Sequence, residues 1–302
     1  MKYVAQHPAN QGRRMKVVGG SASLNLAQNL ARVLGVDYVS VQHEKHPGGF
    51  PDGEQYVRLQ ASVKGEDIVV VQTTHPDSKI IELLLLEDAV REGGAASLTL
   101  VIPYFGYGRQ DKKFEEGEGV SARVLAKHVQ AQADAIYTMG LHNPSVLGYF
   151  DVPAKEVDGM PAVARYLKGR GVDLVLSPDK GAVRHAKEVS EAIGASWDWL
   201  EKERIDSFTV RMAPKNLDAR GKRVAIVDDV ISTGRTIVSA ANAVKEQGAT
   251  GVMAACLHGL FTANALEHLK VCDDVVSTDT VPSPMSKISV AEDFAVAIKA
   301  DR

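Results

Sequence analysis

Short apolar runs alternate with longer amphipathic segments along most of the chain. The apolar runs are rich in Val, Ile and Leu and end in Gly, Asp, Thr or Pro, which is typical of buried strands. The segments between them carry apolar residues at helical spacing over roughly 10 to 15 positions. This alternation predicts right-handed strand–helix–strand crossovers and a parallel sheet.

The pattern runs through the chain twice. Strands are expected at 15–20, 37–42, 67–74, 97–104, 135–141, 173–179, 223–229, 251–258 and 274–280. Helices are expected at 24–35, 80–94, 121–132, 160–171, 182–194, 237–248 and 261–270. The sequence thus predicts an α/β fold with two tandem doubly wound parallel-sheet domains. A length of 302 residues agrees with two domains of about 150 residues each.

Domain boundaries follow from where the pattern restarts. Residues 1–15 are expected to form a polar leader, 16–156 the N-terminal domain and 157–284 the C-terminal domain. The closing segment 285–302 is expected to complete the N-terminal domain. No Gly/Ser-rich linker separates the domains, so we expect them to be closely packed.

Composition narrows the function classes. A net charge of −3 argues against a dedicated nucleic-acid binder, and no apolar run reaches the ~20 residues that span a bilayer. The first residues lack the apolar core of a secretory signal. Cys256 and Cys272 have no metal-ligand spacing and are expected to be inert core thiols. These features favour a cytoplasmic enzyme that binds no nucleic acid and no membrane.

The segment VAIVDDVISTGRT (224–236) carries the strongest chemical signal. A buried strand ends in Asp228 and Asp229, and a loop with the hydroxyls of Ser232, Thr233 and Thr236 then opens a helix. Backbone N–H groups at a helix N-terminus favour a phosphate. The two carboxylates would lie where a ribose diol or a metal-bound sugar could be held. The pattern resembles the 5-phosphoribosyl-1-pyrophosphate (PRPP) binding loop of the type I phosphoribosyltransferase fold.

Ligands of such sheets bind beyond the carboxyl ends of the strands, so other loops at these ends are candidates. Asp179 lies in SPDKGA (177–182), which has the composition of an ordinary turn but also suits a pyrophosphate or a metal. Arg109 and Gln110 open the cationic run RQDKK, which is either a solvated loop or a polyphosphate site.

Three further segments have a plain structural interpretation beside a functional one. Asp52 and Gly53 in GGFPDGEQYVRL (48–59) suit a simple turn. His142 follows an expected strand, where a hydrogen-bonded surface histidine is the commoner case and a metal ligand the alternative. Lys202 and Arg204 would point to one side of an extended segment, either as solvent-exposed decoration or as a functional pair.

Taken in this order, the motifs resemble those of the ribose-phosphate pyrophosphokinase (PRPP synthase) family from about residue 16 to 299, and especially its shorter archaeal-type members. The resemblance rests on FPDGE, PYFGYGRQDKK, LHNPSVLGYFDVP, LVLSPDKGA, EKER and VDDVISTGRT. It implies Mg-dependent transfer of a diphosphoryl group from ATP to ribose 5-phosphate. It also implies a homo-oligomer whose nucleotide site is shared between subunits.

The resemblance implies a role for each matching residue. Phe50, Asp52 and Glu54 match a segment that reaches ATP from a neighbouring subunit, and Arg109 and Gln110 match a pair that contacts the nucleotide. Two residues match positions at Mg²⁺, namely His142 and Asp179. The mobile catalytic loop of the family is matched by Lys202 and Arg204. The ribose 5-phosphate site is matched by Asp228, Asp229, Ser232, Thr233, Gly234, Arg235 and Thr236.

The chain also departs from the common family pattern. Gly140 stands where an aspartate often precedes Leu-His, and Phe114 stands where an aspartate often follows RQDKK. The alternatives are a phosphoribosyltransferase that consumes PRPP and a base, or a non-catalytic subunit of a synthase complex. The transferase leaves RQDKK and the Lys202/Arg204 pair without a role. The non-catalytic subunit has only Gly140 in its support.

Overall fold

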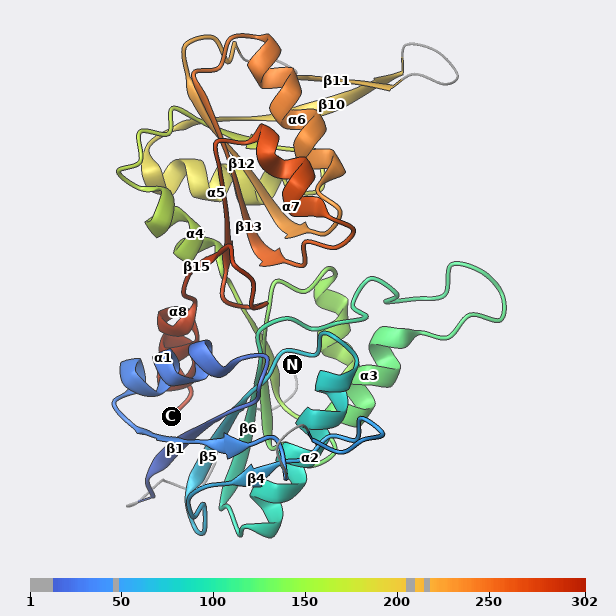
Figure 1. Cartoon of the computed structure of the whole chain (residues 1–302), viewed down its shortest axis with the longest axis vertical. Helices are drawn as coiled ribbons and strands as arrows, with labels where there is room; N and C mark the ends of the chain where they lie inside the picture. Colours follow the sequence, from blue (N-terminus) through green and yellow to red (C-terminus); the bar gives the residue numbers. More distant parts are fainter. Residues whose placement is uncertain (1–12, 46–48, 205–209, 215–217) are drawn as a thin grey trace. The chain divides into compact units, whose positions relative to one another are not determined.

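The computed structural model describes residues 13–45, 49–204, 210–214 and 218–302, with backbone alone for 202–204 and 210–214. The expected polar leader therefore lies outside the described residues up to position 12. The chain divides into two units, one formed by residues up to Val157 together with Ala291–Arg302, and the other by Asp158–Val290. Each unit is an α/β unit built on its own sheet (Figure 1).

The first unit contains a six-stranded sheet in the order β2-β1-β5-β6-β7-β8, and every pair in it is parallel. Its strands are β1 (Met15–Gly19), β2 (Asp37–Val39), β5 (Asp67–Val71), β6 (Ser97–Ile102), β7 (Ala135–Met139) and β8 (Ala154–Val157). Its helices are α1 (Leu24–Leu34), α2 (Ser78–Glu92), α3 (Ser121–Val129), the 3-10 helix η1 (Pro144–Tyr149) and α8 (Ala291–Ala300).

Helices cover both faces of the first sheet. Figure 1 shows α1 and α8 on one face and α2 and α3 on the other. Leu83, Leu86 and Val90 of α2 pack with Leu98 and Leu100 of β6 in a buried apolar cluster. The closing helix α8 is fastened to this unit at its end, where the Tyr137 hydroxyl donates to Asp301 at 2.7 Å. A sheet buried on both faces explains why its strands read as continuous apolar runs.

The second unit contains a seven-stranded sheet in the order β11-β10-β9-β12-β13-β14-β15. Its strands are β9 (Leu174–Ser177), β10 (Ser196–Arg204), β11 (Val210–Pro214), β12 (Arg223–Ile231), β13 (Gly251–Gly259), β14 (Asp274–Thr278) and β15 (Ser286–Ile288). Its helices are α4 (Met160–Leu167), α5 (Val183–Ile193), α6 (Arg235–Glu246), α7 (Ala265–His268) and the 3-10 helix η2 (Leu269–Val271). The β10–β11 pair is antiparallel, and the other pairs are parallel.

The predicted parallel α/β architecture is confirmed, but two of the expected elements are wrong in part. The expected strand 37–42 is split into β2 and β3 (Val41–Gln42), and β3 pairs antiparallel with β4 (Arg58–Leu59) in a separate two-stranded sheet. The expected helix 261–270 begins only at Ala265, because the preceding loop is held in left-handed backbone conformations.

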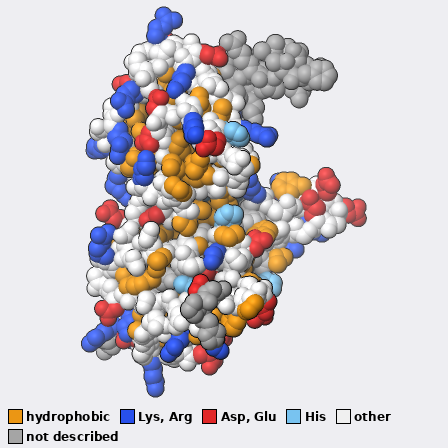
Figure 2. Space-filling model, in the orientation of Figure 1, with side chains coloured by type: hydrophobic (Ala, Val, Ile, Leu, Met, Phe, Trp, Pro, Cys, Tyr) orange, Lys and Arg blue, Asp and Glu red, His pale blue; other side chains and the backbone are white. Residues whose placement is uncertain are grey.

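Basic and acidic side chains are mixed over the face shown in Figure 2, in keeping with the small net charge. In the described part of the chain, no helix combines the length and the apolar character that crossing a bilayer requires.

A buried carboxyl group on α2 makes a prediction about stability. Glu87 is 1% exposed, and burial raises its pKa from 4.5 to about 8. The folded protein then keeps a proton that the unfolded chain releases, so stability falls as the pH rises from about 4.5 to about 8. We expect Glu87→Gln to flatten this slope and to be more stable than wild type at pH 9, measured by urea unfolding at several pH values.

Glu92→Gln is the matched control, because Glu92 lies exposed on the same helix. Equal pH slopes in wild type and Glu87→Gln would show that Glu87 is not protonated in the folded chain.

Candidate active site

Three loops of the second unit leave neighbouring strands at the same edge of the sheet. They follow β9, β12 and β13, which are adjacent in the order β9-β12-β13 and run parallel. Parallel strands place their carboxyl ends together, so the loop after β9, the end of β12 with its loop, and residues 260–264 lie at one edge. The strongest chemical signal of the sequence, at 228–236, is central in this arrangement.

Asp228 and Asp229 lie near the end of β12, where both are partly buried. The Asp228 carboxylate accepts a hydrogen bond from the Asp229 N–H at 3.0 Å, and the Asp229 carboxylate accepts one from the Val230 N–H at 2.8 Å. Burial raises the pKa of Asp228 to about 8, and the negative charges of Asp229 and Asp179 add to this rise. Ionising Asp228 is therefore unfavourable at this edge, and a cation or hydroxyl donors bound there would stabilise its ionised form.

Asp179 comes from the neighbouring strand β9. Its carboxylate accepts the Gly181 N–H at 2.8 Å, and its carbonyl oxygen accepts the Ser177 hydroxyl at 2.6 Å. These two bonds close a tight loop and orient the carboxyl group. A Cβ at position 181 would lie 3.1 Å from an oxygen of this carboxylate, so glycine leaves room for the turn.

The segment 232–236 is the entry into α6. Gly234 is the residue before the helix, at φ +74°, and it is buried. Thr233 and Arg235 are exposed, while Ser232 and Thr236 are partly buried. The N–H groups of a first helical turn lack partners within the helix, so this turn can bind an anion.

The loop after β13 contacts the loop formed by residues 232–236 (the phosphate-type loop), which the sequence pattern did not predict. Phe261, Ala263 and Asn264 have φ values of +44°, +52° and +57°. The Thr262 N–H donates to the Ser232 carbonyl at 3.0 Å, and the two side-chain hydroxyl oxygens lie 3.1 Å apart. Three non-glycine residues with left-handed backbone store strain that these contacts offset. Thr262 is thus a candidate site residue that the expected helix had concealed.

The first unit presents a second edge of the same kind. Arg109 and Gln110 lie in the loop after β6, and His142 follows the neighbouring strand β7. The Asn143 amide donates to the carboxylate of Asp111, whose carbonyl oxygen accepts the Tyr149 hydroxyl at 2.6 Å. These contacts tie the Arg109–Gln110 loop to the segment that carries His142, which is exposed.

The departure at Gly140 has a conformational basis. Gly140 has φ +55°, a left-handed conformation that glycine adopts without steric cost. Aspartate and asparagine tolerate this region better than most residues. The backbone conformation at position 140 therefore limits which residues can stand there, whatever the role of the nearby His142.

The remaining expected site residues lie apart from these loops or outside the described side chains. Phe50 and Asp52 belong to a turn closed by the Gly53 N–H and the Phe50 carbonyl at 3.0 Å, and Glu54 follows it exposed. Lys202 and Arg204 lie on the backbone of β10, opposite Met212 and Val210 of β11, and their side chains are outside the described part. His142 belongs to the first unit and Asp179 to the second.

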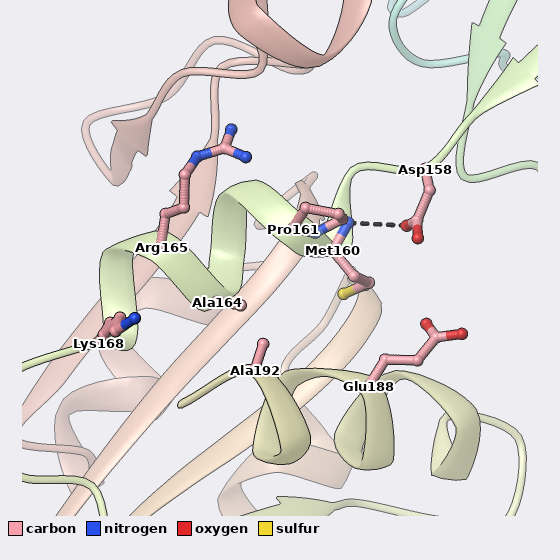
Figure 3. A pocket seen from close by; sticks show the side chains of 8 residues that line it. All are labelled: Asp158, Met160, Pro161, Ala164, Arg165, Lys168, Glu188 and Ala192. Carbon is pink, nitrogen blue, oxygen red and sulfur yellow. Dashed lines mark hydrogen bonds between the residues drawn. The ribbon is translucent and has the colours of Figure 1, made fainter. Parts of the chain in front are cut away.

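A separate hollow lies between α4 and α5 of the second unit (Figure 3). Its volume is about 410 Å³, and it is lined by Asp158, Met160, Pro161, Ala164, Arg165, Lys168, Glu188 and Ala192. None of the expected site residues lines it. In the described part of the chain, no group of three or more His, Cys, Asp or Glu side chains is arranged to hold a metal ion.

Comparison with known proteins gives one consistent result. Residues 15–132 match the family model described as the N-terminal domain of ribose phosphate pyrophosphokinase, and residues 155–294 match the phosphoribosyl transferase domain. A ribose-phosphate pyrophosphokinase of Methanopyrus kandleri is 42% identical over 94% of this chain and 99% of its own length. One from Pyrococcus abyssi is 41% identical over 92% of this chain and 97% of its own length.

A solved structure agrees with the sequence matches. Phosphoribosylpyrophosphate synthetase from Mycobacterium smegmatis has a TM-score of 0.79 and 30% identity, covering 95% of this chain and 98% of that one. The predicted type I phosphoribosyltransferase fold and the resemblance to the pyrophosphokinase family are confirmed, including the likeness to archaeal members.

The backbone at Gly234 makes a prediction about the phosphate-type loop. A Cβ at this position would lie 3.1 Å from Leu269 Cγ, and φ +74° is unfavourable for alanine by about 1–2 kcal/mol. We expect Gly234→Ala to lose this backbone contribution and a further amount for the displaced Leu269, as measured by urea unfolding.

Gly221→Ala separates the two costs, because Gly221 has φ +72° and open space around its Cβ position. Equal losses in the two variants would show that Leu269 moves aside without cost.

Proposed function

Because the chain belongs to the ribose-phosphate pyrophosphokinase family, we propose that it transfers the β,γ-diphosphoryl group of ATP to the C1 hydroxyl of ribose 5-phosphate. The products are PRPP and AMP. The observation that carries the proposal is the edge of the second unit, where paired carboxylates on β12 stand directly before a loop that opens α6.

Ribose 5-phosphate is assigned to this edge by its chemistry. The 5-phosphate suits the N–H groups and hydroxyls of residues 232–236, because a helix N-terminus favours an anion. Asp228 and Asp229 suit the ribose hydroxyls, since carboxylates accept hydrogen bonds from a diol.

ATP is assigned to the first unit. Arg109 provides a planar fork of donors for phosphate oxygens, and Gln110 provides an amide for the nucleotide. Phe50, Asp52 and Glu54 are proposed to reach the nucleotide of a neighbouring subunit, which requires a homo-oligomer. Their exposed or partly buried positions leave them accessible for such a contact.

The carboxyl group of Asp179 suits Mg²⁺, which prefers oxygen ligands and is bound through one or two carboxylates together with substrate phosphates. Burial raises the pKa of Asp228, and the neighbouring Asp229 and Asp179 raise it further, so a cation at this edge would favour its ionised form. His142 is proposed as a further metal position from the family match. When bound, Mg²⁺ would offset the negative charge of the phosphate oxygens.

The reaction forms a bond between the C1 oxygen of ribose 5-phosphate and the β-phosphorus of ATP. The bond between the β-phosphorus and the bridging oxygen to the α-phosphate breaks, and AMP leaves with that oxygen. Positioning and charge stabilisation are the main contributions of a protein to phosphoryl transfer. Lys202 and Arg204 are proposed to supply cations from the β10–β11 arm and to exclude water.

Phosphorus NMR of the protein with ribose 5-phosphate, ATP and Mg²⁺ tests the proposed function. We expect AMP and a C1 diphosphate ester of the sugar in equal amounts. Intact ATP, combined with pyrophosphate release from added PRPP and a base, would instead identify a phosphoribosyltransferase. Absence of both reactions would favour a non-catalytic subunit.

The proposed arm makes a separate prediction. We expect Lys202→Ala to lower kcat by roughly 10³- to 10⁵-fold, as loss of a transition-state cation does in phosphoryl transfer, while ATP binding stays near wild type. Steady-state rates and calorimetric ATP titration check the two parts. Lys187→Ala is the control, because Lys187 is an exposed lysine on α5 that is paired with Glu191. A near-normal kcat in Lys202→Ala would remove the arm from the mechanism.

A further inference from the structure

One carboxylate organises the loop that carries Gln110. An oxygen of Glu118, Oε2, accepts hydrogen bonds from the Gln110 side-chain amide at 2.9 Å and from the backbone N–H groups of Phe114 and Glu115 at 2.6 and 3.0 Å. The two backbone bonds are the main causes that lower the pKa of Glu118 from its ordinary value. The carboxylate is therefore ionised at neutral pH and acts only as an acceptor.

This contact determines how the Gln110 amide is turned. A carboxylate can only accept, so the NH₂ group of Gln110 must face Glu118. The same nitrogen also donates to the Lys112 carbonyl at 3.3 Å. Both N–H bonds of the amide are thereby directed into the loop. Among the described residues no donor bonds to the side-chain carbonyl oxygen of Gln110, so this oxygen is available as an acceptor.

The base of the loop holds Gln110 in place. The backbone N–H of Gln110 donates to the Tyr107 carbonyl at 3.3 Å, and the backbone carbonyl oxygen of Gln110 accepts from the Ala122 N–H at 3.2 Å. The next residue, Asp111, is 7% exposed and bonded to Asn143 and Tyr149. A side chain fixed at its backbone and at its amide nitrogen has little freedom to turn over.

An aromatic ring lies in the same loop. Phe114 is 60% exposed, and its N–H is one of the three donors to Glu118. An exposed ring provides a flat apolar surface on which a nucleobase can stack. The loop thus combines the aromatic surface of Phe114 with an available acceptor, the side-chain carbonyl oxygen of Gln110.

We propose that Glu118 is a positioning residue which orients the Gln110 amide so that the enzyme selects a nucleotide whose base carries an exocyclic amino group. The inference rests on the proposed function, in which Gln110 contacts the nucleotide. In this proposal the amino group of adenine donates to the side-chain carbonyl oxygen of Gln110. Hypoxanthine carries a carbonyl oxygen at the same ring position, so two acceptors would face each other.

The test compares ATP with inosine triphosphate in wild type and Glu118→Gln. A glutamine at 118 offers either a donor or an acceptor, so the Gln110 amide is released to turn over. We expect the ATP-to-ITP ratio of kcat/KM to fall by roughly 3- to 10-fold, which is the value of one hydrogen bond. The KM for ribose 5-phosphate should stay unchanged. Glu116→Gln is the matched control, because it makes the same charge change at an exposed position of the same loop.

A double-mutant cycle with Gln110→Ala shows whether Glu118 acts through Gln110. We expect Glu118→Gln to leave the ATP-to-ITP ratio unchanged once Gln110 has been removed. A ratio that falls equally with and without Gln110 would overturn the positioning role. An unchanged ATP-to-ITP ratio in Glu118→Gln would overturn this inference. The proposed function would still stand, because it rests on the activity of the wild type.

Hydrogen exchange gives a readout that does not depend on turnover. The N–H groups of Phe114 and Glu115 should exchange faster in Glu118→Ala than in wild type or Glu116→Gln. Equal exchange in all three proteins would contradict the role of Glu118 in the loop. A wild type that forms neither AMP from ATP nor IMP from ITP would overturn the proposed function, and this inference with it.

Discussion

The cost of ionising the partly buried carboxyl groups at the end of β12 is the constraint on which the site depends. Burial raises the pKa of Asp228, and the carboxyl groups of Asp229 and Asp179 raise it further. A protein gains no stability from such crowding, and unpaired like charges are disfavoured in a partly buried place. The arrangement is reasonable if a bound cation or a sugar diol completes it, which links the local electrostatics to the proposed substrate.

The architecture supplies this site by simple means. Neighbouring parallel strands end at one edge, so β9, β12 and β13 bring Asp179, the paired aspartates and the brace at Thr262 together although they are far apart in sequence. The first unit uses the same rule to bring the Gln110 loop beside the segment after β7. Two copies of one layout thus present two such edges, which we propose for the sugar phosphate and for the nucleotide.

Features that depend on contiguous residues could be predicted from the sequence. The buried strand before Asp228 and the loop into α6 could be located because their apolar run, carboxylates and hydroxyls are contiguous. The residues 261–264 could not, since ALEHLK has helical spacing while the left-handed conformations before it depend on contacts with Ile231 and Ser232. The role of Glu118 could not be predicted either, because it lies in a run of glutamates and its hydrogen-bond partners depend on how the loop folds. The expected roles of the individual site residues stay predictions.

The most direct measurement is a crystal structure of the protein grown with ribose 5-phosphate and Mg²⁺. The account predicts the phosphate within hydrogen-bond distance of the backbone N–H groups of residues 233–236, with the ribose hydroxyls at Asp228 and Asp229. A sugar phosphate bound elsewhere, with this edge of the second unit left without ligand, would contradict the central claim.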